Sequence, residues 1–183
     1  MRINTPRLVL RPLKPSDARS ITDNINDLAV SRWLLVVPYP YSLKDAKDWI
    51  SQNRRSWKKK KPDGYHFGIE LKSEKRIIGG IGLFAIHEFS GYAEVGYWLG
   101  RKYHRKGYGS EALAAILRFA FTRLKFRRLE AGVFKGNPGS GKLLEKFGFK
   151  KEGLKLEARR SKADGKIKDE YIYGLLNKNF RFR

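Results

Sequence analysis

The hydrophobic period of the sequence changes near residue 104, and this change limits the folds open to the chain more than any other feature. Residues 92–99 are rich in aromatic and aliphatic side chains, as in a strand. A glycine-containing segment, residues 104–110, follows. Apolar residues then recur at helical spacing, at Leu113, Leu117, Ala120, Phe121 and Leu124. The sequence therefore predicts a strand, a glycine loop and a long amphipathic helix in that order.

Further strands and helices are predicted on both sides of this unit. On its N-terminal side we expect a strand at 7–13, a helix entered at 15–17, a helix from Ser42 to about 57, and strands at 65–71 and 76–86. On its C-terminal side we expect a strand at 128–134, a helix at 138–147, and strands at 149–157 and 168–176 joined by a turn at 163–165. This order predicts a mixed α/β sheet.

Composition favours one packed domain without thiol chemistry. The 183 residues are 41% hydrophobic, which is enough apolar material for a core and predicts a single domain over 1–183. Cysteine is absent and the three histidines are scattered, which excludes disulfides, thiolate metal sites and cysteine nucleophiles. The longest apolar stretch, 34–37, ends at Pro38, and no signal-peptide pattern is present, so we expect a cytoplasmic protein.

The chain is strongly basic. Lys and Arg number 40 against 18 Asp and Glu, which gives a formal net charge of +22. Such a charge attracts nucleic acid, coenzyme phosphates or acidic peptides, and by itself it does not choose among them. The basic run at 58–61 and the pair Arg181 and Arg183 are candidates for contact with RNA, with a solvated surface as the alternative.

The segment at 104–110 is a candidate phosphate-binding loop. Gly107 and Gly109 would let the backbone approach a phosphate closely, and the first amides of the following helix are unpaired donors. Arg105 and Lys106 add positive charge beside them. A tight turn without a ligand is the alternative interpretation.

A second glycine-rich segment, at 136–143, matches the Walker spacing G-x-x-x-x-G-K. Leu143 stands where a P-loop needs a Ser or Thr hydroxyl for magnesium. This segment is therefore kept as the alternative: a P-loop-like nucleotide binder.

Taken together, these segments resemble the GNAT acetyltransferase superfamily, and within it the Rim-type branch. The superfamily carries Q/R-x-x-G-x-G/A after its fourth strand, and residues 104–109 are HRKGYG, with His104 at the Gln or Arg position. Residues 137–153 are similar to the N-x-x-S…G-F…E-G segment of the branch. The segments RLVLRPL at 7–13, IIGGIG at 77–82 and DEYIY at 169–173 extend the resemblance over most of the chain.

The resemblance implies a fold and a reaction. The fold is a splayed, mostly antiparallel mixed α/β sheet of about six to seven strands flanked by about four helices. The reaction is direct transfer of an acetyl group from acetyl-CoA to a primary amine in a ternary complex, without a metal. The branch implies a protein N-terminal α-amino group, such as that of a ribosomal protein, as acceptor. A polyamine or other small amine is the alternative, and a basic RNA- or ribosome-binding module without catalysis is the alternative of another class. Monomer and homodimer both remain open.

The same resemblance implies which residues hold acetyl-CoA. Pantetheine would lie along the strand at Trp98 and Leu99 as an added strand and bond to Asn137. The pyrophosphate would lie on the loop formed by Arg105, Lys106, Gly107, Tyr108, Gly109 and Ser110. Helix capping is the alternative role for Asn137.

Two residues are the catalytic candidates that the resemblance implies. Glu94 is the general base, directly or through water, with Glu157 as the alternative carboxylate and a solvated or salt-bridged surface as the alternative role. Ser140 assists the leaving CoA thiolate, since the tyrosine that many GNAT enzymes use one turn later is Leu144 here. Its alternative role is a helix cap.

Three aromatic residues, Trp33, Tyr39 and Tyr41, fall where GNAT enzymes build the wall of the acceptor site between their first helices. Ordinary core packing is the alternative for this cluster. Glu111 is assigned to structure, because a carboxylate in the first turn of a helix favours the helix dipole.

Overall fold

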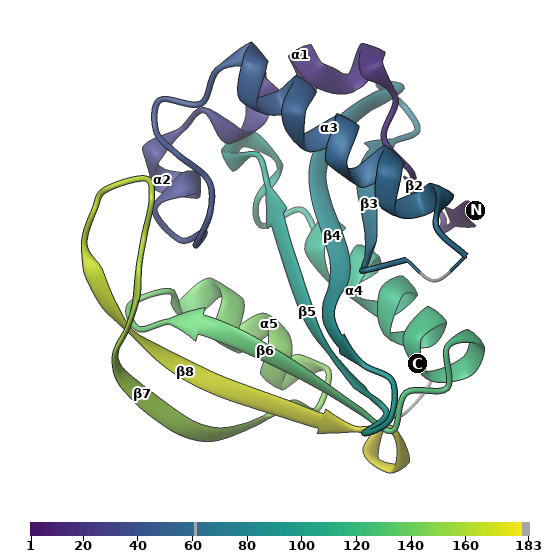
Figure 1. The fold of residues 1–183 in the computed structure, drawn as a ribbon, viewed down its shortest axis with the longest axis vertical. Helices are drawn as coiled ribbons and strands as arrows, with labels where there is room; N and C mark the ends of the chain where they lie inside the picture. The colour runs from purple at the N-terminus through teal and green to yellow at the C-terminus, as the bar shows by residue number, and fades with distance from the viewer. Residues whose placement is uncertain (61, 181–183) are drawn as a thin grey trace.

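The computed structural model describes residues 1–60 and 62–180, and within them one sheet runs in the order β1-β2-β3-β4-β5-β6-β8-β7. Neighbouring strands are antiparallel except for the parallel pair β5 and β6 (Figure 1). The strands are β1 (Ile3–Asn4), β2 (Leu8–Arg11), β3 (Tyr65–Leu71), β4 (Arg76–His87), β5 (Tyr92–Leu99), β6 (Arg128–Phe134), β7 (Lys150–Arg160) and β8 (Ile167–Leu176). The predicted mixed, mostly antiparallel sheet is confirmed.

The sheet has eight strands instead of six to seven, because β1 pairs with β2. Two residues are too few to show a period of two in the sequence. The strand expected at 7–13 ends at Arg11, and β7 extends to Arg160, past the residue where its strand was expected to end.

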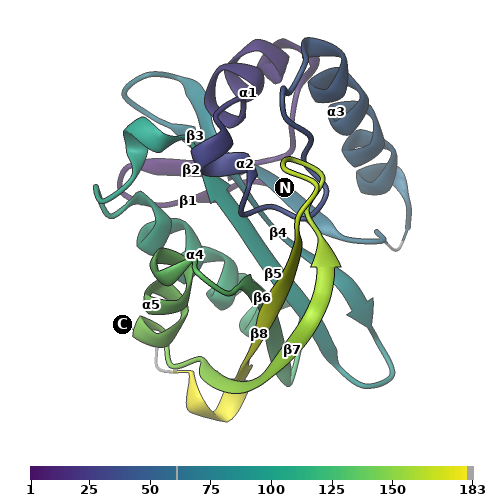
Figure 2. The ribbon, with the colours of Figure 1, turned by 90° about the vertical axis from the view of Figure 1, so that its left-hand side faces the viewer.

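Helices cover both faces of the sheet (Figure 2). The short η1 (Pro15–Asp17), α1 (Ala18–Ile25) and α3 (Leu43–Lys58) cover one face, and α4 (Tyr108–Arg118) and α5 (Pro138–Lys146) cover the other. The single turn α2 (Leu28–Ser31) adds a fifth α-helix to the four expected. The long helix expected up to residue 124 is divided into α4 and a π-helical segment, η3 (Phe119–Arg123). None of these helices is long and apolar enough to cross a membrane.

Two hydrophobic clusters lie on opposite faces of the sheet because successive strand residues point to opposite sides. In β4, Ile78 packs into the larger cluster with α4, whereas Ile77 packs into the smaller one with α1 and α3. A buried ionic group borders the smaller cluster. Arg11 is 5% exposed and bonds both carboxylate oxygens of Asp17 at 2.8 Å, which ties β2 to η1.

The sheet splits between β5 and β6. These strands pair over only three residue pairs, from Tyr92 with Arg128 to Glu94 with Glu130. Beyond them β5 continues along β4 and β6 continues along β8, so the two strands diverge (Figure 1). The facing edge of β5 therefore carries backbone groups without a strand partner, in the middle of the sheet.

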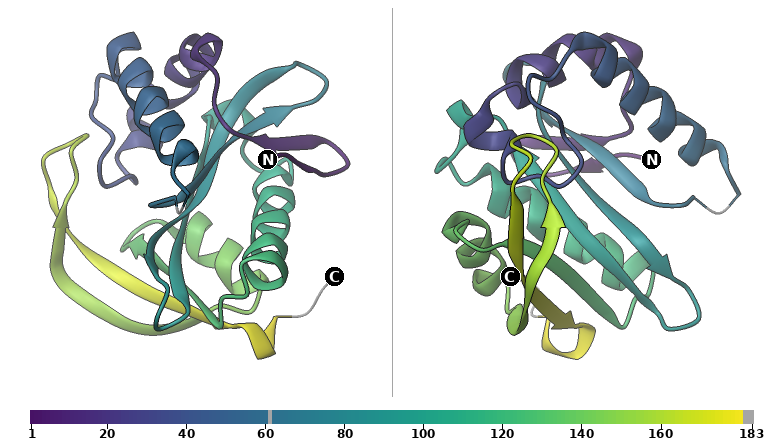
Figure 3. Two further views of the ribbon diagram at one scale, coloured as in Figure 1. Left: turned by 45° about the vertical axis from the view of Figure 1, so that its right-hand side comes forward. Right: turned by 60° about the vertical axis from the view of Figure 1, so that its left-hand side comes forward.

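The hairpin of β7 and β8 reaches the loop that follows α2 (Figure 3). Lys162 at the hairpin tip donates its N–H to the Leu35 carbonyl oxygen at 3.1 Å. The ammonium group of Lys168 donates to the Arg32 carbonyl oxygen at 2.5 Å. These bonds hold the loop that follows α2 against the hairpin of β7 and β8.

Candidate active site

The open edge of β5 directs backbone groups into the split. Gly100 donates its N–H to the Ile78 carbonyl oxygen at 2.9 Å, which sets the hydrogen-bonding phase between β5 and β4. Since N–H groups alternate in direction along a strand, Trp98 bonds toward β4, and Tyr97 and Leu99 point their N–H groups into the split. From the sequence we expected pantetheine to pair with the backbone of Trp98 and Leu99. The register of β5 instead leaves the N–H groups of Tyr97 and Leu99 pointing into the split. The Trp98 side chain packs against the smaller cluster.

The loop before α4 presents the N-terminus of that helix. Gly107 has φ of +83°, a left-handed conformation that strains any residue with a Cβ atom, and it directly precedes α4. Glu111 donates its N–H to the Gly107 carbonyl oxygen at 3.1 Å. The amides of Tyr108, Gly109 and Ser110 therefore have no acceptor within the helix. Such free amides at a positive helix end form a phosphate-binding site.

Contacts with the N-terminal strands fix this loop. Glu111 accepts hydrogen bonds from the Arg7 Nε at 2.7 Å and from the Thr5 hydroxyl at 2.6 Å. Arg7 also donates to the Lys106 carbonyl oxygen at 3.0 Å. The structural role expected for Glu111 is confirmed. Arg105 has φ of +58° and is exposed, as is Lys106, so both guanidinium and ammonium groups are available beside the helix end.

His104 closes the connection from β5 to α4. Its Nε2 lies 2.8 Å from the Leu99 carbonyl oxygen. That carbonyl belongs to the last residue of the open edge, so the imidazole occupies one backbone group there. The residue that departs from the superfamily pattern thus has a local structural role at the strand end.

The start of α5 brings a hydroxyl pair to the split. Asn137 caps α5, accepting the Ser140 N–H on its Oδ1 at 3.4 Å, so the capping role expected as an alternative is present. The Ser140 hydroxyl does not cap the helix and lies 2.9 Å from the Tyr97 hydroxyl. Tyr97 is on β5, so this bond joins the two sides of the split through side chains.

Tyr97 is a residue that the sequence analysis missed. Burial raises its pKa to about 12, so its hydroxyl stays protonated and can act as a hydrogen-bond donor. The signal was available in the alternation of β5. Ala93 and Val95 are buried on the same face of the strand, and a tyrosine that continues a buried face needs a partner for its hydroxyl.

Glu94 lies on the opposite face of β5 from Tyr97, because the two residues differ by an odd number of positions. It is half-buried. Burial raises its pKa above the ordinary value and the Glu170 carboxylate raises it further, while Arg159 acts in the opposite direction. Glu94 and Ser140 therefore approach the split from its two faces and do not contact one another.

Glu157, the alternative carboxylate, is exposed in an irregular part of β7 with φ of +46°. Its N–H donates to the Asp169 carboxylate at 3.0 Å. The charged groups that act on Glu94 are Glu170, Arg159, Glu130 and Lys155, and Glu157 is not among them.

The three aromatic residues of the expected acceptor wall are separated in the structure. Tyr41 is 6% exposed within the smaller cluster, where burial raises its pKa to about 12, so it has the core-packing role. Tyr39 is 43% exposed. Trp33 is half-buried next to Gly136, whose Cβ position would be 3.4 Å from the indole ring. The Lys168 ammonium group lies 5.5 Å from that ring. Of the three, only Trp33 contacts the connection between β6 and α5.

Residues 136–143 do not form a P-loop. Helix α5 begins at Pro138, so Gly139, Gly141 and Lys142 are already helical and no glycine loop remains to surround a phosphate. The nucleotide-binding alternative for this segment is therefore wrong.

Comparisons with known proteins agree with this architecture. The family model of the acetyltransferase (GNAT) domain matches residues 7–150. The uncharacterized N-acetyltransferase p20 of Bacillus licheniformis is 33% identical over 96% of this chain and 96% of its own. The [ribosomal protein uS5]-alanine N-acetyltransferase of Escherichia coli is 30% identical over 84% of this chain and 80% of its own.

A solved structure shows the same fold with its ligands. The spermidine N-acetyltransferase of Vibrio cholerae, in complex with CoA and spermine, covers 96% of this chain and 98% of its own with a TM-score of 0.79 at 22% identity. The chain therefore belongs to the GNAT acetyltransferases, in their Rim-type branch, and is an acetyl-CoA-dependent N-acetyltransferase.

Proposed function

We propose that the chain acetylates the N-terminal α-amino group of a protein, and that a ribosomal protein is this acceptor. The name of the E. coli relative supports this choice, since that enzyme acts on an alanine of ribosomal protein uS5. Ribosomal proteins are made in the cytoplasm, and we place the reaction there.

The observation that carries this acceptor is the isolation of Glu94. On the same face, Glu130 is paired with Arg128 at 2.8 Å, and Glu170 lies 3.8 Å from Arg159. In the described parts of the chain Glu94 itself forms no ion pair. A polyamine carries several cationic groups and would need several free carboxylates, whereas a terminal amine needs one. The arrangement favours an acceptor with a single amine.

Glu94 is proposed as the general base. An amine attacks only in its neutral form, so the ammonium group that binds must lose a proton. A carboxylate whose pKa is raised by burial is a stronger base than an exposed one. We infer that the acceptor amine binds on the face of the sheet that carries Glu94. Water between the carboxylate and the amine would serve the same proton transfer.

Ser140 is proposed to donate a hydrogen bond to the sulfur that leaves. Its hydroxyl lies at the split on the face opposite Glu94, 2.9 Å from the Tyr97 hydroxyl, which also donates to the Ser140 carbonyl oxygen at 3.3 Å. In this proposal Tyr97 is the donor of the shorter bond, because the Ser140 proton is needed at the sulfur. Tyr97 then polarises Ser140 toward donation, because a hydroxyl that accepts a hydrogen bond becomes a better donor. Tyr97 is a positioning residue in this scheme.

The residues at the split fit acetyl-CoA, which supplies the acetyl group as a thioester. The amides of Tyr108, Gly109 and Ser110 would hold its pyrophosphate at the start of α4. The open backbone of Tyr97 and Leu99 would pair with its pantetheine arm. Arg105 and Lys106 would add charge next to the phosphates.

The test is acetyl transfer to defined acceptors. Peptides that begin with Ala or Ser, the same peptides with a blocked N-terminus, and spermidine are compared by the release of the CoA thiol. The chain has no cysteine, so the protein adds no thiol background. We expect transfer to the free peptides, with mass spectrometry locating the acetyl group on the α-amine. A higher kcat/KM for spermidine than for every free peptide would refute this acceptor.

Two matched variants test the base. Glu94→Gln should lower kcat about 10²- to 10⁴-fold while the Kd for acetyl-CoA stays unchanged. Glu157→Gln, a carboxylate on an exposed strand, should leave kcat unchanged. The reverse pattern would transfer the role of base to Glu157.

A further inference from the structure

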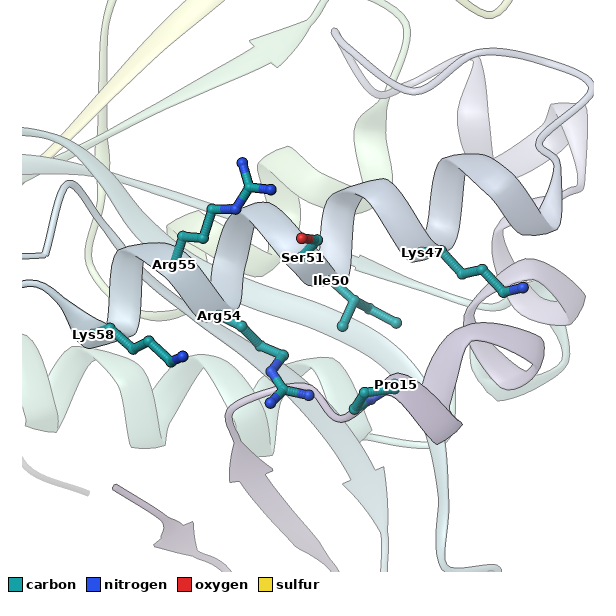
Figure 4. Close-up of a pocket in the computed structure, with 7 residues that line it drawn as sticks. All are labelled: Pro15, Lys47, Ile50, Ser51, Arg54, Arg55 and Lys58. Atoms are coloured by element: carbon teal, nitrogen blue, oxygen red, sulfur yellow. The ribbon is translucent and has the colours of Figure 1, made fainter.

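A basic groove runs along the outer side of α3, away from the split (Figure 4). It has a volume of about 320 Å³. Pro15 and Ile50 form its apolar part, and Lys47, Arg54, Arg55 and Lys58 surround it. In Figure 4 the Arg54 side chain extends toward Pro15 of η1, whereas Arg55 extends to the other side of the helix. We call this surface the α3 groove.

The cations of the α3 groove follow one side of the helix. Lys47, Arg54 and Lys58 are at positions i, i+7 and i+11, which fall on one face of an α-helix. At a rise of about 1.5 Å per residue they span roughly 16 Å along the axis. From residue 51 to residue 60 the sequence has five basic residues and no carboxylate. A linear anion lying along the helix would meet cations over this whole length.

These charges are uncompensated, whereas neighbouring ones are paired. Lys44 bonds Asp48 at 2.6 Å, and Lys59 bonds Asp63. In residues 1–60 and 62–180 the four cations of the α3 groove have no carboxylate partner. Helix stability explains part of this pattern, because cations favour the C-terminal end of a helix. It does not explain Lys47, which lies in the first half of α3.

A second groove adjoins the first across η1. It has a volume of about 830 Å³ and includes Lys14, Ser16 and Arg19, next to the Pro15 that lines the α3 groove. Its three carboxylates, Asp17, Asp23 and Glu70, are each paired with an arginine. Lys14 and Arg19 are exposed. The cationic surface therefore continues from α3 onto η1 and α1.

The α3 groove lacks the anchors that a protein partner or unpaired bases would use. Protein interfaces depend on exposed aromatic or aliphatic side chains that fill a pocket, and single-stranded nucleic acids stack on exposed aromatic rings. The two tryptophans of α3 are half-buried: Trp49 packs against the smaller cluster, and Trp57 donates its indole N–H to the His66 carbonyl oxygen at 3.0 Å. What the groove offers is positive charge.

We propose that the α3 groove binds the phosphate backbone of double-stranded RNA. Recognition rests on charge and on the length of the helix, without contact to base edges. The choice of RNA over DNA rests on the proposed function, because a ribosomal-protein acceptor lies beside ribosomal RNA. Of the basic residues singled out in the sequence for RNA contact, Lys58 belongs to this groove, whereas Lys61, Arg181 and Arg183 lie outside the described residues.

The groove is placed so that acetyl transfer and RNA binding do not compete. Helix α3 covers the face of the sheet opposite α4 and α5, whose N-terminal ends are at the split. Its capping residue, Ser42, directly follows the loop that carries Trp33 and Tyr39. RNA held along α3 would leave the glycine loop free and keep the acceptor side of the split next to the RNA surface.

The test compares two variants of equal charge. The groove variant is Lys47→Gln, Arg54→Gln and Lys58→Gln, and the control variant is Arg123→Gln, Lys125→Gln and Lys150→Gln, three exposed cations elsewhere. Binding to a labelled RNA duplex, the matching DNA duplex and a poly-glutamate peptide is measured by anisotropy over a series of salt concentrations. Transfer to an Ala-peptide without RNA is measured in parallel, and thermal unfolding verifies the fold of each variant.

We expect the groove variant to reduce the salt dependence of RNA binding by a log–log slope of about 3, because each lost phosphate contact removes about 0.9. Between about 50 and 200 mM salt the wild type then loses about 40-fold more affinity than the groove variant. The control variant should keep the wild-type slope, and both variants should acetylate the free peptide normally.

Three results would overturn the proposal. Equal losses in both variants would show that only net charge matters. Tighter binding of the DNA duplex than of the RNA duplex would remove the assignment to RNA. Tighter binding of poly-glutamate than of the RNA duplex would point to an acidic protein. Failure of peptide acetylation in the wild type would refute the proposed acceptor. The RNA-binding curves of the wild type and the two variants would still test the α3 groove, because they do not depend on acetylation.

Discussion

Replacing Tyr97 with Phe should slow acetyl transfer, and we expect the whole effect to come from the loss of its contact with Ser140. The substitution removes one hydroxyl and keeps the ring, so β5 and its packing against the larger cluster remain. The contacts that are lost are the bond between the Tyr97 and Ser140 hydroxyls at 2.9 Å and the longer bond from the Tyr97 hydroxyl to the Ser140 carbonyl oxygen at 3.3 Å. Because the pKa of Tyr97 is about 12, its hydroxyl is protonated at any pH where the enzyme is assayed. The effect should therefore not depend on pH.

The magnitude follows from the type of bond. A neutral hydrogen bond between side chains contributes about 1 kcal/mol, and this loss corresponds to a kcat about fivefold lower. Ser140→Ala removes the direct donor and should lower kcat about 100-fold, the lower limit for one donor at a developing negative charge. In the Ser140→Ala background the tyrosine keeps only its bond to the carbonyl oxygen of residue 140, which takes no part in the proposed step. Tyr97→Phe should then have no further effect, which gives a coupling energy of about 1 kcal/mol.

The assay is a double-mutant cycle on kcat at saturating acetyl-CoA, with an Ala-peptide as acceptor. Tyr173→Phe is the matched control, because the Tyr173 hydroxyl donates to Glu145 on the same helix at 3.3 Å and does not touch Ser140. It should leave kcat unchanged. The Kd for acetyl-CoA, measured by calorimetry, should be the same in all the variants.

A positioning role for Tyr97 is refuted if Tyr97→Phe lowers kcat by the same factor with and without the Ser140 hydroxyl. Such additivity would mean that Tyr97 acts on another group. A wild-type kcat in Tyr97→Phe would remove it from the reaction altogether.

Four further variants test the rest of the site and the fold. A base works only when ionised, so kcat/KM falls as pH drops through the pKa of Glu94. Glu170 raises this pKa, so Glu170→Gln should move the acid limb of the kcat/KM profile to lower pH. Arg159 lowers it, so Arg159→Gln should move the acid limb to higher pH. Gly107→Ala introduces a side chain at φ of +83° and costs about 1–2 kcal/mol, so we expect acetyl-CoA binding about tenfold weaker by calorimetry. Asp17→Asn removes the bidentate partner of the buried Arg11 guanidinium, which keeps its bond to Glu70, and should lower the free energy of unfolding in urea by about 1.5–3 kcal/mol.

Each of these variants has a defined contrary result. Shifts of the acid limb in the same direction would show that Glu94 is not the titrating base. Gly165→Ala, at φ of +66° on the open hairpin tip, is the control for Gly107→Ala. Equal weakening of acetyl-CoA binding by both variants would show that the loop at Gly107 does not hold the pyrophosphate. Asp23→Asn is the control for Asp17, because its bond to Arg76 is exposed; an equal loss of stability in both would contradict the role of burial.

Much of the fold could be predicted because its signals are local. The strand β5, the glycine turn and helix α4 were expected from a change of period within about thirty residues. The turn of the last hairpin was expected from Ala163, Asp164 and Gly165, and Gly165 has φ of +66° there. The strand β1 was missed because its two residues gain their structure only by pairing with β2.

The site was harder to predict than the fold, because its contacts join distant segments. Asn137 and Ser140 were singled out by their motif, yet the partner of Ser140 is Tyr97, 43 positions earlier. Tyr41 and Trp33 were expected to act together, and packing placed the first in the core and the second beside Gly136. Two side chains eight positions apart, as Trp33 and Tyr41 are, can lie in different environments when the loop between them folds back on itself.

Nearest-neighbour patterns and composition were enough to predict the order of strands and helices, the glycine turn before α4 and the excess of positive charge. Three features became visible only in the folded molecule: β5 and β6 separate after Glu94, Glu94 and Ser140 face the split from opposite sides, and the α3 cations have no carboxylate partner among residues 1–60 and 62–180. These features arise from the packing of two helical layers against a sheet, which no local period encodes.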